Sequence, residues 1–239
     1  MHRFFALLVL LFASTAQGSA QDARAHFDRG KARLADGDQA GAREAFLLSV
    51  EAAPTWLLPW LELGELAVAR REGVEEAREA LRALGPPRSN PRYHRILGDL
   101  AELAGDDEAA VGAWRNSLAV LAWQDEVRLR MAAALERLGR PAEAAEEYAH
   151  LVERHPGDLV VLARLAHALE AAGAYESARE ALETLVRYQP GQEIPLRRLA
   201  RFLERRGELE AARRAHAEAD RVGRKGAPRK MRPLPPSRR

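Results

Sequence analysis

The 239-residue chain contains no cysteine, which excludes a disulfide framework and any chemistry that depends on a thiolate. Aromatic residues make up only 6% of the sequence, whereas alanine, leucine, glutamate and arginine are abundant. This composition favours helices that pack through small side chains over sheets. We therefore expect an almost wholly helical protein.

Motifs typical of enzymes are also lacking. The sequence has no Gly-x-Ser-x-Gly, no phosphate-binding glycine loop and no dinucleotide fingerprint. The seven histidines are scattered, and the spacing of His150 and His155 does not place two ligands on one helical turn. We expect no catalytic residue, cofactor or metal, and the chain is predicted not to be an enzyme. A hidden hydrolase or catalytic domain is the alternative, but the sequence offers no candidate nucleophile or base for it.

The N-terminus has the features of a secretory signal peptide. Arg3 supplies a positive start, residues 4–13 form an apolar run of ten, and Gly18-Ser19-Ala20 ends in small residues. The apolar run is short for a membrane span, and no cysteine lies near the cleavage site to take lipid. We predict residues 1–20 to be cleaved, with cleavage after Ala16 or an uncleaved interfacial anchor as alternatives. The expected mature chain is exported, periplasmic or secreted, and has no transmembrane span.

Charge is distributed unevenly along the chain. The formal net charge is +2, but residues 21–220 hold 28 basic and 35 acidic side chains. Residues 221–239 hold eight basic side chains and no acidic one, together with several prolines and glycines. We predict a disordered, basic, proline-rich tail over residues 223–239. The basic isoelectric point belongs to this tail and not to the body.

Glycines recur at a fixed interval in the body. The residues at this position are separated by 34 or 68, and each is followed five residues later by alanine. The glycines are Gly37, Gly105, Gly139, Gly173 and Gly207. A period of this length indicates a repeat array. Repeats starting near residues 23, 57, 91, 125, 159 and 193 fill residues 21–222, and each is expected to form two helices separated by the glycine.

Small residues also recur in the first helix of each repeat, and large ones in the second. The small residues, spaced by 34, are Gly30, Gly64, Gly98, Ala132, Ala166 and Ala200. The large residues, each four places after a second-helix alanine, are Phe46, Trp114, Tyr148 and Leu182. We expect each small residue to let the two helices of a hairpin approach closely. The second repeat departs from the pattern, because its glycine is displaced to Gly73 and Gly85-Pro86-Pro87 should shorten its second helix.

These residues resemble the tetratricopeptide repeat family. The first-helix half of the motif is carried by Trp60-x-x-Leu63-Gly64 and His94-x-x-Leu97-Gly98, and the second half by Ala42-x-x-x-Phe46 and Ala110-x-x-x-Trp114. The resemblance covers about 200 residues, six repeats in unbroken register. It implies an all-α, right-handed α-solenoid of about six helix-turn-helix repeats, whose first helices line a concave groove for a peptide or partner protein. It also implies a binding scaffold and not a catalyst.

Two sets of charged residues are candidates for that groove. Glutamates recur every 34 residues in the first helices, at Glu102, Glu136, Glu170 and Glu204, with an arginine series at Arg130, Arg164 and Arg198. The last repeat adds a basic stripe of Arg197, Arg201 and Arg205, which suits an acidic peptide, a carboxyl terminus or phosphate. The alternative for both sets is a solvated face with occasional ion pairs. The asparagines of a family-type carboxylate clamp are absent from the first helices.

Acidic residues at the turns have a structural explanation. Asp36-Gly37-Asp38 and the run from Gly105 to Glu108 lie where a second helix starts, and acids there stabilise the helix N-terminus. We therefore do not predict a calcium site.

The sequence therefore supports two candidate non-catalytic functions. The first is a scaffold or adaptor of the cell envelope that binds another protein or peptide in its groove. The second is tethering or assembly at the envelope surface, in which the tail binds anionic lipid or another polyanion. Nucleic acid is an unlikely partner for an exported chain, although the tail has suitable electrostatics.

Overall fold

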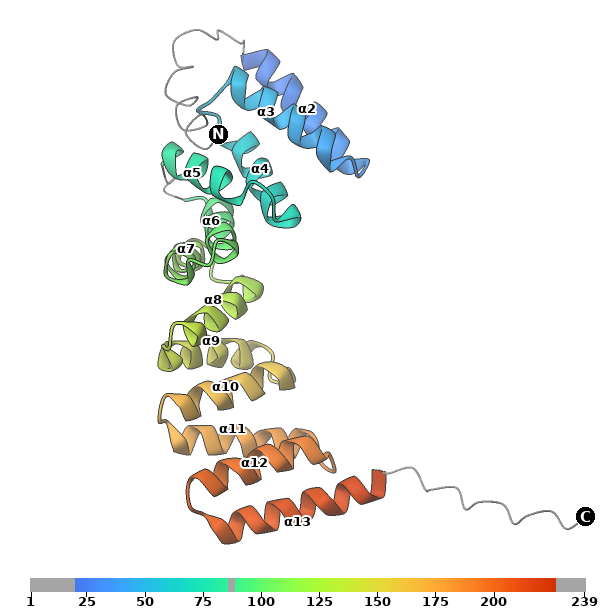
Figure 1. Cartoon of the computed structure of the whole chain (residues 1–239), viewed down its shortest axis with the longest axis vertical. Coiled ribbons are helices and arrows are strands. Elements are labelled where there is room, and N and C mark those ends of the chain that lie inside the picture. The colour runs from blue at the N-terminus through green and yellow to red at the C-terminus, as the bar shows by residue number, and fades with distance from the viewer. Residues whose placement is uncertain (1–19, 86–88, 227–239) are drawn as a thin grey trace, which may run out of the picture. The chain divides into compact units, whose positions relative to one another are not determined.

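Glycines in a left-handed conformation end the first helices, as the sequence predicts. The computed structural model describes residues 20–85 and 89–226 (Figure 1). Within them, Gly37, Gly105, Gly139, Gly173 and Gly207 have φ between +70° and +81°. The residue after each glycine donates its N–H to a carbonyl of the preceding helix, as Ala174 does to Leu169 at 2.9 Å. This closed turn satisfies the carbonyls at the helix end and reverses the chain.

All regular elements in the described residues are α-helices, and they divide into two compact units. The N-terminal unit, up to Arg140, contains α2 (Ala20–Ala35), α3 (Gln39–Ala52), α4 (Leu57–Arg70), α5 (Val74–Leu84), α6 (Pro91–Leu103), α7 (Asp107–Val120) and α8 (Asp125–Arg137). The C-terminal unit, from Pro141, contains α9 (Pro141–Arg154), α10 (Leu159–Ala171), α11 (Tyr175–Tyr188), α12 (Glu193–Arg205) and α13 (Leu209–Gly226). The all-α fold of helical repeats is thus confirmed.

Each unit is built by stacking helical hairpins. In the N-terminal unit α2 packs on α3, α4 on α5 and α6 on α7, and α3, α5 and α7 each contact the helix that follows. In the C-terminal unit the same arrangement joins α9 through α13 (Figure 1). Five first helices begin at residues 57, 91, 125, 159 and 193, the expected repeat starts, whereas α2 begins at Ala20, three residues before the expected start.

Small residues lie where the helices of a hairpin cross. A Cβ atom built on Gly30 would lie 2.5 Å from the ring of Phe46, and one built on Gly98 would lie 2.4 Å from the ring of Trp114. Both aromatic side chains are fully buried, as is Tyr148. A methyl group at Gly30 or Gly98 would therefore force the facing ring to shift, which favours glycine in these two repeats.

The second repeat is irregular in the way the sequence indicates. Its second helix, α5, has 11 residues and is bounded by Gly73 and Gly85, both with positive φ. Arg71, which ends α4, is the one non-glycine residue with positive φ among the described residues. The two prolines after Gly85 lie outside the described residues.

The predicted end of the array needs a correction. Helix α13 continues to Gly226, four residues beyond the expected boundary at residue 222. Gly223 is accommodated within the helix although glycine lowers helix propensity. The remainder of the predicted tail, from residue 227, and residues 1–19 of the predicted leader lie outside the described residues. Within the described part, no helix is both long and apolar enough to cross a bilayer.

Candidate functional site

The four glutamates proposed to line a groove occupy equivalent places, in the last turn of the first helix of their repeats. They are Glu102 in α6, Glu136 in α8, Glu170 in α10 and Glu204 in α12. Glu102 and Glu170 are only partly exposed, with 24% and 20% of their side-chain surfaces accessible. Their position is regular, but their accessibility is limited.

These glutamates are engaged inside the array. Glu102 accepts hydrogen bonds from Arg130 at 2.6 Å and Arg137 at 3.1 Å, both on α8. The carboxylate of Glu170 accepts two parallel hydrogen bonds from Arg205 on α12, at 2.7 and 2.8 Å.

The other two glutamates are engaged as well. Glu204 lies 3.0 Å from the imidazole of His216, and Glu136 also has an interaction partner. Ion pairing between repeats therefore accounts for Glu102 and Glu170, and all four glutamates of the row have interaction partners.

A continuous ladder of opposite charges crosses the first helices of the N-terminal unit. We call it the charge ladder. It runs along α2, α4, α6 and α8 and ends at the first residue of α7; it comprises Lys31, Glu62, Arg92, Glu65, Arg95, Asp99, Arg130, Glu102, Arg137 and Asp107. In the order given, each residue of the ladder lies within salt-bridge distance of the next. Lys31 lies 3.1 Å from Glu62, and Arg137 lies 2.6 Å from Asp107. The ladder joins four consecutive repeats.

Two carboxylates of the ladder are buried. The side chains of Glu62 and Asp99 are only 5% and 3% exposed. Asp99 also accepts a hydrogen bond from the indole of Trp114 at 2.9 Å, and the guanidinium of Arg130 lies over that indole at 5.2 Å. A buried carboxylate is tolerated only with such partners, because an unpaired buried charge costs several kcal/mol. The ladder therefore stabilises the contact between repeats.

The pKa values in the ladder shift in opposite directions. Burial raises the pKa of Asp99, and the charge of Arg130 and the hydrogen bond from Trp114 offset this only in part. Burial also opposes ionisation of Glu65, but hydrogen bonds and charges from Arg92 and Arg95 outweigh it and lower the pKa of Glu65. The more accessible Glu65 is thus the better stabilised anion.

The predicted basic stripe on α12 is divided by its contacts. Arg197 pairs with Glu193 and, at 2.9 Å, with Asp220 on α13, and Arg205 pairs with Glu170. Arg201 is exposed and has no ion pair within residues 20–85 and 89–226. Among the described residues, Arg201 is therefore the one stripe residue whose guanidinium is not already paired with a carboxylate and could bind an external anion.

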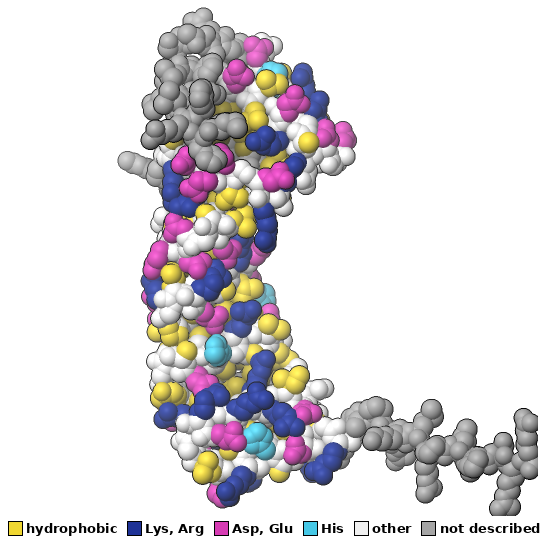
Figure 2. Space-filling model, viewed as in Figure 1, with side chains coloured by type: hydrophobic (Ala, Val, Ile, Leu, Met, Phe, Trp, Pro, Cys, Tyr) yellow, Lys and Arg dark blue, Asp and Glu magenta, His cyan; other side chains and the backbone are white. Residues whose placement is uncertain are grey.

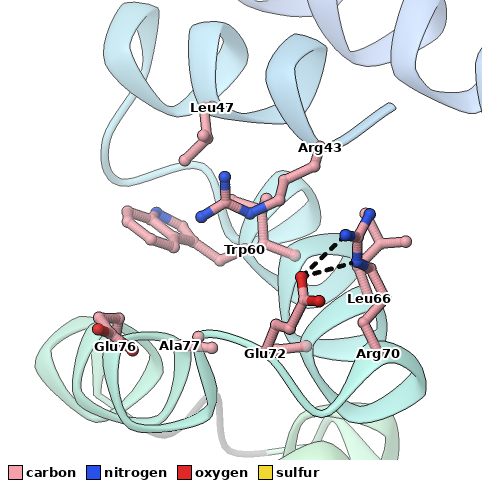
Figure 3. Close-up of a pocket in the computed structure, with 11 residues that line it drawn as sticks. Arg43, Leu47, Trp60, Leu66, Arg70, Glu72, Glu76 and Ala77 are labelled. Carbon is pink, nitrogen blue, oxygen red and sulfur yellow. Dashed lines mark hydrogen bonds and ion pairs between the residues drawn. The ribbon is translucent and has the colours of Figure 1, made fainter. Parts of the chain in front are cut away.

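A small apolar cleft lies in the N-terminal unit between α3, α4 and α5, with a volume of about 190 Å³ (Figure 3). Leu47, Trp60, Leu66 and Ala77 contribute apolar surface. At its edge Arg70 and Glu72 form an ion pair at 2.8 Å. The cleft is smaller than a typical small-molecule site, so it suits a single side chain. Sequence reasoning missed it because it arises where the irregular second repeat meets α3.

The metal site and the turn acids considered in the sequence can be compared with the described residues. No group of three histidine or acidic residues within them is arranged to hold a metal ion. The acids at the turns cap helices, since Asp38 accepts from the N–H of Gly41 at 2.8 Å and Asp106 from that of Ala109 at 3.1 Å. Their structural explanation is confirmed.

Two exposed apolar residues were not singled out from the sequence. Val160 on α10 and Ile194 on α12 are 34 residues apart and each is 68% exposed. The helices that carry them are joined directly by the Arg205–Glu170 pair. The common spacing of 34 is the signal that could have identified them.

Comparison with known proteins connects this architecture to a family. Two models described as tetratricopeptide repeat match residues 137–194 and 10–55. No curated protein sequence matches the chain.

Several solved structures have a similar fold. The MamA protein is 19% identical with a TM-score of 0.62, and the match covers 72% of this chain and 93% of MamA. YrrB, described as a TPR protein with an unusual peptide-binding site, is 17% identical with a TM-score of 0.63, covering 78% of this chain and 96% of YrrB. A MamA fragment from Desulfovibrio magneticus RS-1 is 18% identical with a TM-score of 0.54, covering 70% and 94%. At these identities the likeness concerns the fold alone.

Proposed function

Because the chain belongs to the tetratricopeptide repeat family, we propose that it is a non-catalytic scaffold that binds a peptide or an extended segment of a partner protein. The observation that carries the proposal is the pair Val160 and Ile194, two apolar side chains that are each 68% exposed at equivalent positions of neighbouring first helices. Exposed apolar side chains repeated along a surface are typical of an interaction site. The peptide-binding site of YrrB, which has a similar fold, supports the same function.

Residues at equivalent places in the N-terminal unit indicate which surface these side chains share. Arg92 occupies the corresponding position in α6, and its guanidinium reaches Glu62 and Glu65 on the neighbouring first helix. Val160 and Ile194 therefore lie on the surface where first helices of successive repeats meet. This surface extends along α10 and α12 within the C-terminal unit.

Photo-crosslinking tests the proposed binding surface. A photoreactive amino acid placed at Val160 should capture a partner from an extract of the native organism, because the side chain faces the bound segment. The same amino acid at Glu180, which is exposed on the second helix α11, is the control. Equal capture at both sites, or none at Val160, would count against binding by the first helices.

We also propose that the scaffold acts in the cell envelope. The support comes from the N-terminal sequence, where a basic start, a ten-residue apolar run and small residues before Gln21 have the order of a secretory signal. Expression of the full chain with a C-terminal tag in a bacterium, followed by N-terminal sequencing, should give Gln21 as the first residue. Recovery of protein that still carries residues 1–20 from the cytoplasm would contradict export.

A further inference from the structure

The inference rests on the proposed function and concerns the chemistry of the bound segment. In the N-terminal unit, three of the four arginines of the charge ladder pair with carboxylates at positions separated by the repeat length. These carboxylates are Glu65 and Asp99, which are 34 residues apart. They form ion pairs with Arg92, Arg95 and Arg130. These arginines of α6 and α8 are therefore paired with carboxylates of α4 and α6.

The same repeat positions carry different residues in the C-terminal unit. Advancing from Asp99 by 68 and 102 residues leads to His167 in α10 and Arg201 in α12, so the carboxylates are replaced. The position of Arg130 is occupied by Arg164 and Arg198, so the arginines are retained. At the position of Asp99 the carboxylate is therefore lost in α10 and α12, whereas the arginine at the position of Arg130 remains.

The acidic residues of these two helices do not compensate for the change. Glu193 pairs with Arg197, Glu170 with Arg205, and Glu204 with His216. These three are the acidic residues of α10 and α12. Among residues 20–85 and 89–226, Arg198 and Arg201 are both exposed and have neither an ion pair nor a hydrogen bond from their guanidinium groups.

We call the surface of the C-terminal unit at these positions the basic face; it consists of Val160, Arg164, His167, Ile194, Arg198 and Arg201. Figure 2 shows Lys and Arg side chains gathered over α12. The second helix α9, by contrast, carries four glutamates and one arginine. The arginines of α12 outnumber its glutamates, whereas the glutamates of α9 outnumber its arginine.

We infer that the basic face binds an acidic segment of a partner protein, in which apolar side chains contact Val160 and Ile194 while carboxylates pair with Arg198 and Arg201. Charge complementarity identifies the acidic character, because arginines without carboxylates attract them and recognise them through paired hydrogen bonds. The exposed valine and isoleucine identify the apolar character. The chain's own C-terminal region does not fit this face, because residues 221–239 contain no acidic side chain.

Synthetic peptides of about 12 residues can test both parts of the inference, because an extended segment of that length spans two repeats. Three labelled peptides are compared by fluorescence anisotropy: one of alternating glutamate and leucine, one with glutamine for glutamate, and one with serine for leucine. The first should bind at least about tenfold more tightly than either of the others.

Variants of the full chain assign the binding to the basic face. The double variant Arg198→Glu and Arg201→Glu should lose at least about tenfold in affinity for the acidic leucine peptide, because like charges then face each other. The matched control is Arg213→Glu with Arg214→Glu, which makes the same charge change at exposed positions of α13 and should retain affinity within about twofold. Circular-dichroism melting confirms that both variants remain folded.

The outcomes separate this inference from the proposed function. If the glutamine peptide binds as tightly as the glutamate peptide, the groove binds peptides but the acidic preference is wrong. If no peptide binds, or if the double variant binds as well as the control, the basic face is not the site. Equal affinity for anionic vesicles or a single-stranded oligonucleotide would show a general polyanion surface and would also overturn the inference.

Discussion

At the scale of single residues, the space available for a side chain decides where glycine is needed. Gly98 and Gly112 both lie within helices of the third repeat, yet their surroundings differ. A Cβ on Gly98 would lie 2.4 Å from the Trp114 ring, whereas one on Gly112 would have no neighbour within 4 Å. The ring of Trp114 cannot easily move, because its indole is buried and donates to Asp99.

We expect Gly98→Ala to lower the free energy of unfolding by about 1–3 kcal/mol, because the new methyl group overpacks the helix crossing. Gly112→Ala is the matched control and should raise it by about 0.5–1 kcal/mol, because alanine has the higher helix propensity. Urea unfolding followed by circular dichroism measures both values. Equal effects of the two substitutions would show that the crossing is not tightly packed.

The lowered pKa of Glu65 predicts a dependence of stability on pH. A carboxyl group whose pKa is lower in the folded state stabilises the fold above the unfolded pKa, near 4.5, and this contribution is lost as pH falls. Glu65→Gln should therefore destabilise the protein at pH 7 by less than about 1 kcal/mol, since the side chain is 36% exposed and solvent screens the pair.

The difference from the unsubstituted protein should shrink when unfolding is measured at about pH 3. Asp99 has the opposite sign, because its pKa is raised and its ionised form is the less favoured one in the folded state. A destabilisation by Glu65→Gln that stayed constant from neutral to acidic pH would argue against the lowered pKa.

At the scale of single residues, the sequence predicts a feature correctly where the identity of one residue determines it. The small residues at the helix crossings, such as Gly30 and Gly98, could be predicted from the period because a large side chain of the second helix fills the space beside them. The pairing of Arg130 with Asp99 was not predicted, because it depends on how far an arginine reaches between two helices. The glutamate row was found, but its partners were not.

At the scale of helices and turns, one aspartate connects two repeats. Asp106 caps α7 through the N–H of Ala109 at 3.1 Å and accepts a hydrogen bond from Arg78 of α5 at 2.5 Å. The backbone hydrogen bond and the charge of Arg78 both lower the pKa of Asp106. Arg78 is only 10% exposed, so this carboxylate also compensates a largely buried cation.

Asp106→Ala should destabilise the protein by about 1–2 kcal/mol from loss of the cap, with a further loss because Arg78 is left with Glu75 alone. Asp106→Asn should be milder, since asparagine is an equally good cap but lacks the charge. Thermal unfolding of both variants measures the two contributions separately. Indistinguishable losses would assign the whole effect to the charge.

Helix ends could be predicted from the sequence only where a helix-terminating residue such as glycine recurs at the repeat spacing or stands before proline. The glycines at 34-residue spacing set the C-termini of the first helices, and Gly85 ends α5. The helix α13 extends to Gly226, beyond the predicted start of the tail at residue 223, and includes Gly223. A single glycine lowers helix propensity by about 1 kcal/mol, which neighbouring favourable residues can offset.

At the scale of the whole molecule, the period predicts the number of repeats but not how they are grouped. The boundary between the two units falls at Arg140, between the helices of the fourth repeat and not between repeats. Nothing in the register of glycines and alanines marks this position. The contrast in charge between the ladder and the basic face was likewise not evident before side-chain partners were known.

Ionic strength should distinguish the electrostatics of the two units. Raising salt from about 0.1 to 1 M shortens the Debye length from about 10 to 3 Å, which weakens exposed charge interactions far more than buried ones. Affinity for the acidic leucine peptide should therefore fall at least about fivefold, because Arg198 and Arg201 are exposed.

The charge ladder should respond less, because Glu62 and Asp99 are buried, so the melting temperature should change little over the same range. The double variant Arg198→Glu and Arg201→Glu should not lose residual peptide affinity as salt rises, since its glutamates repel the acidic peptide and salt screens that repulsion. A peptide affinity that stayed constant with salt in the unsubstituted protein would mean that apolar contact at Val160 and Ile194 supplies the binding. In that event the arginines of the basic face serve solubility and not recognition.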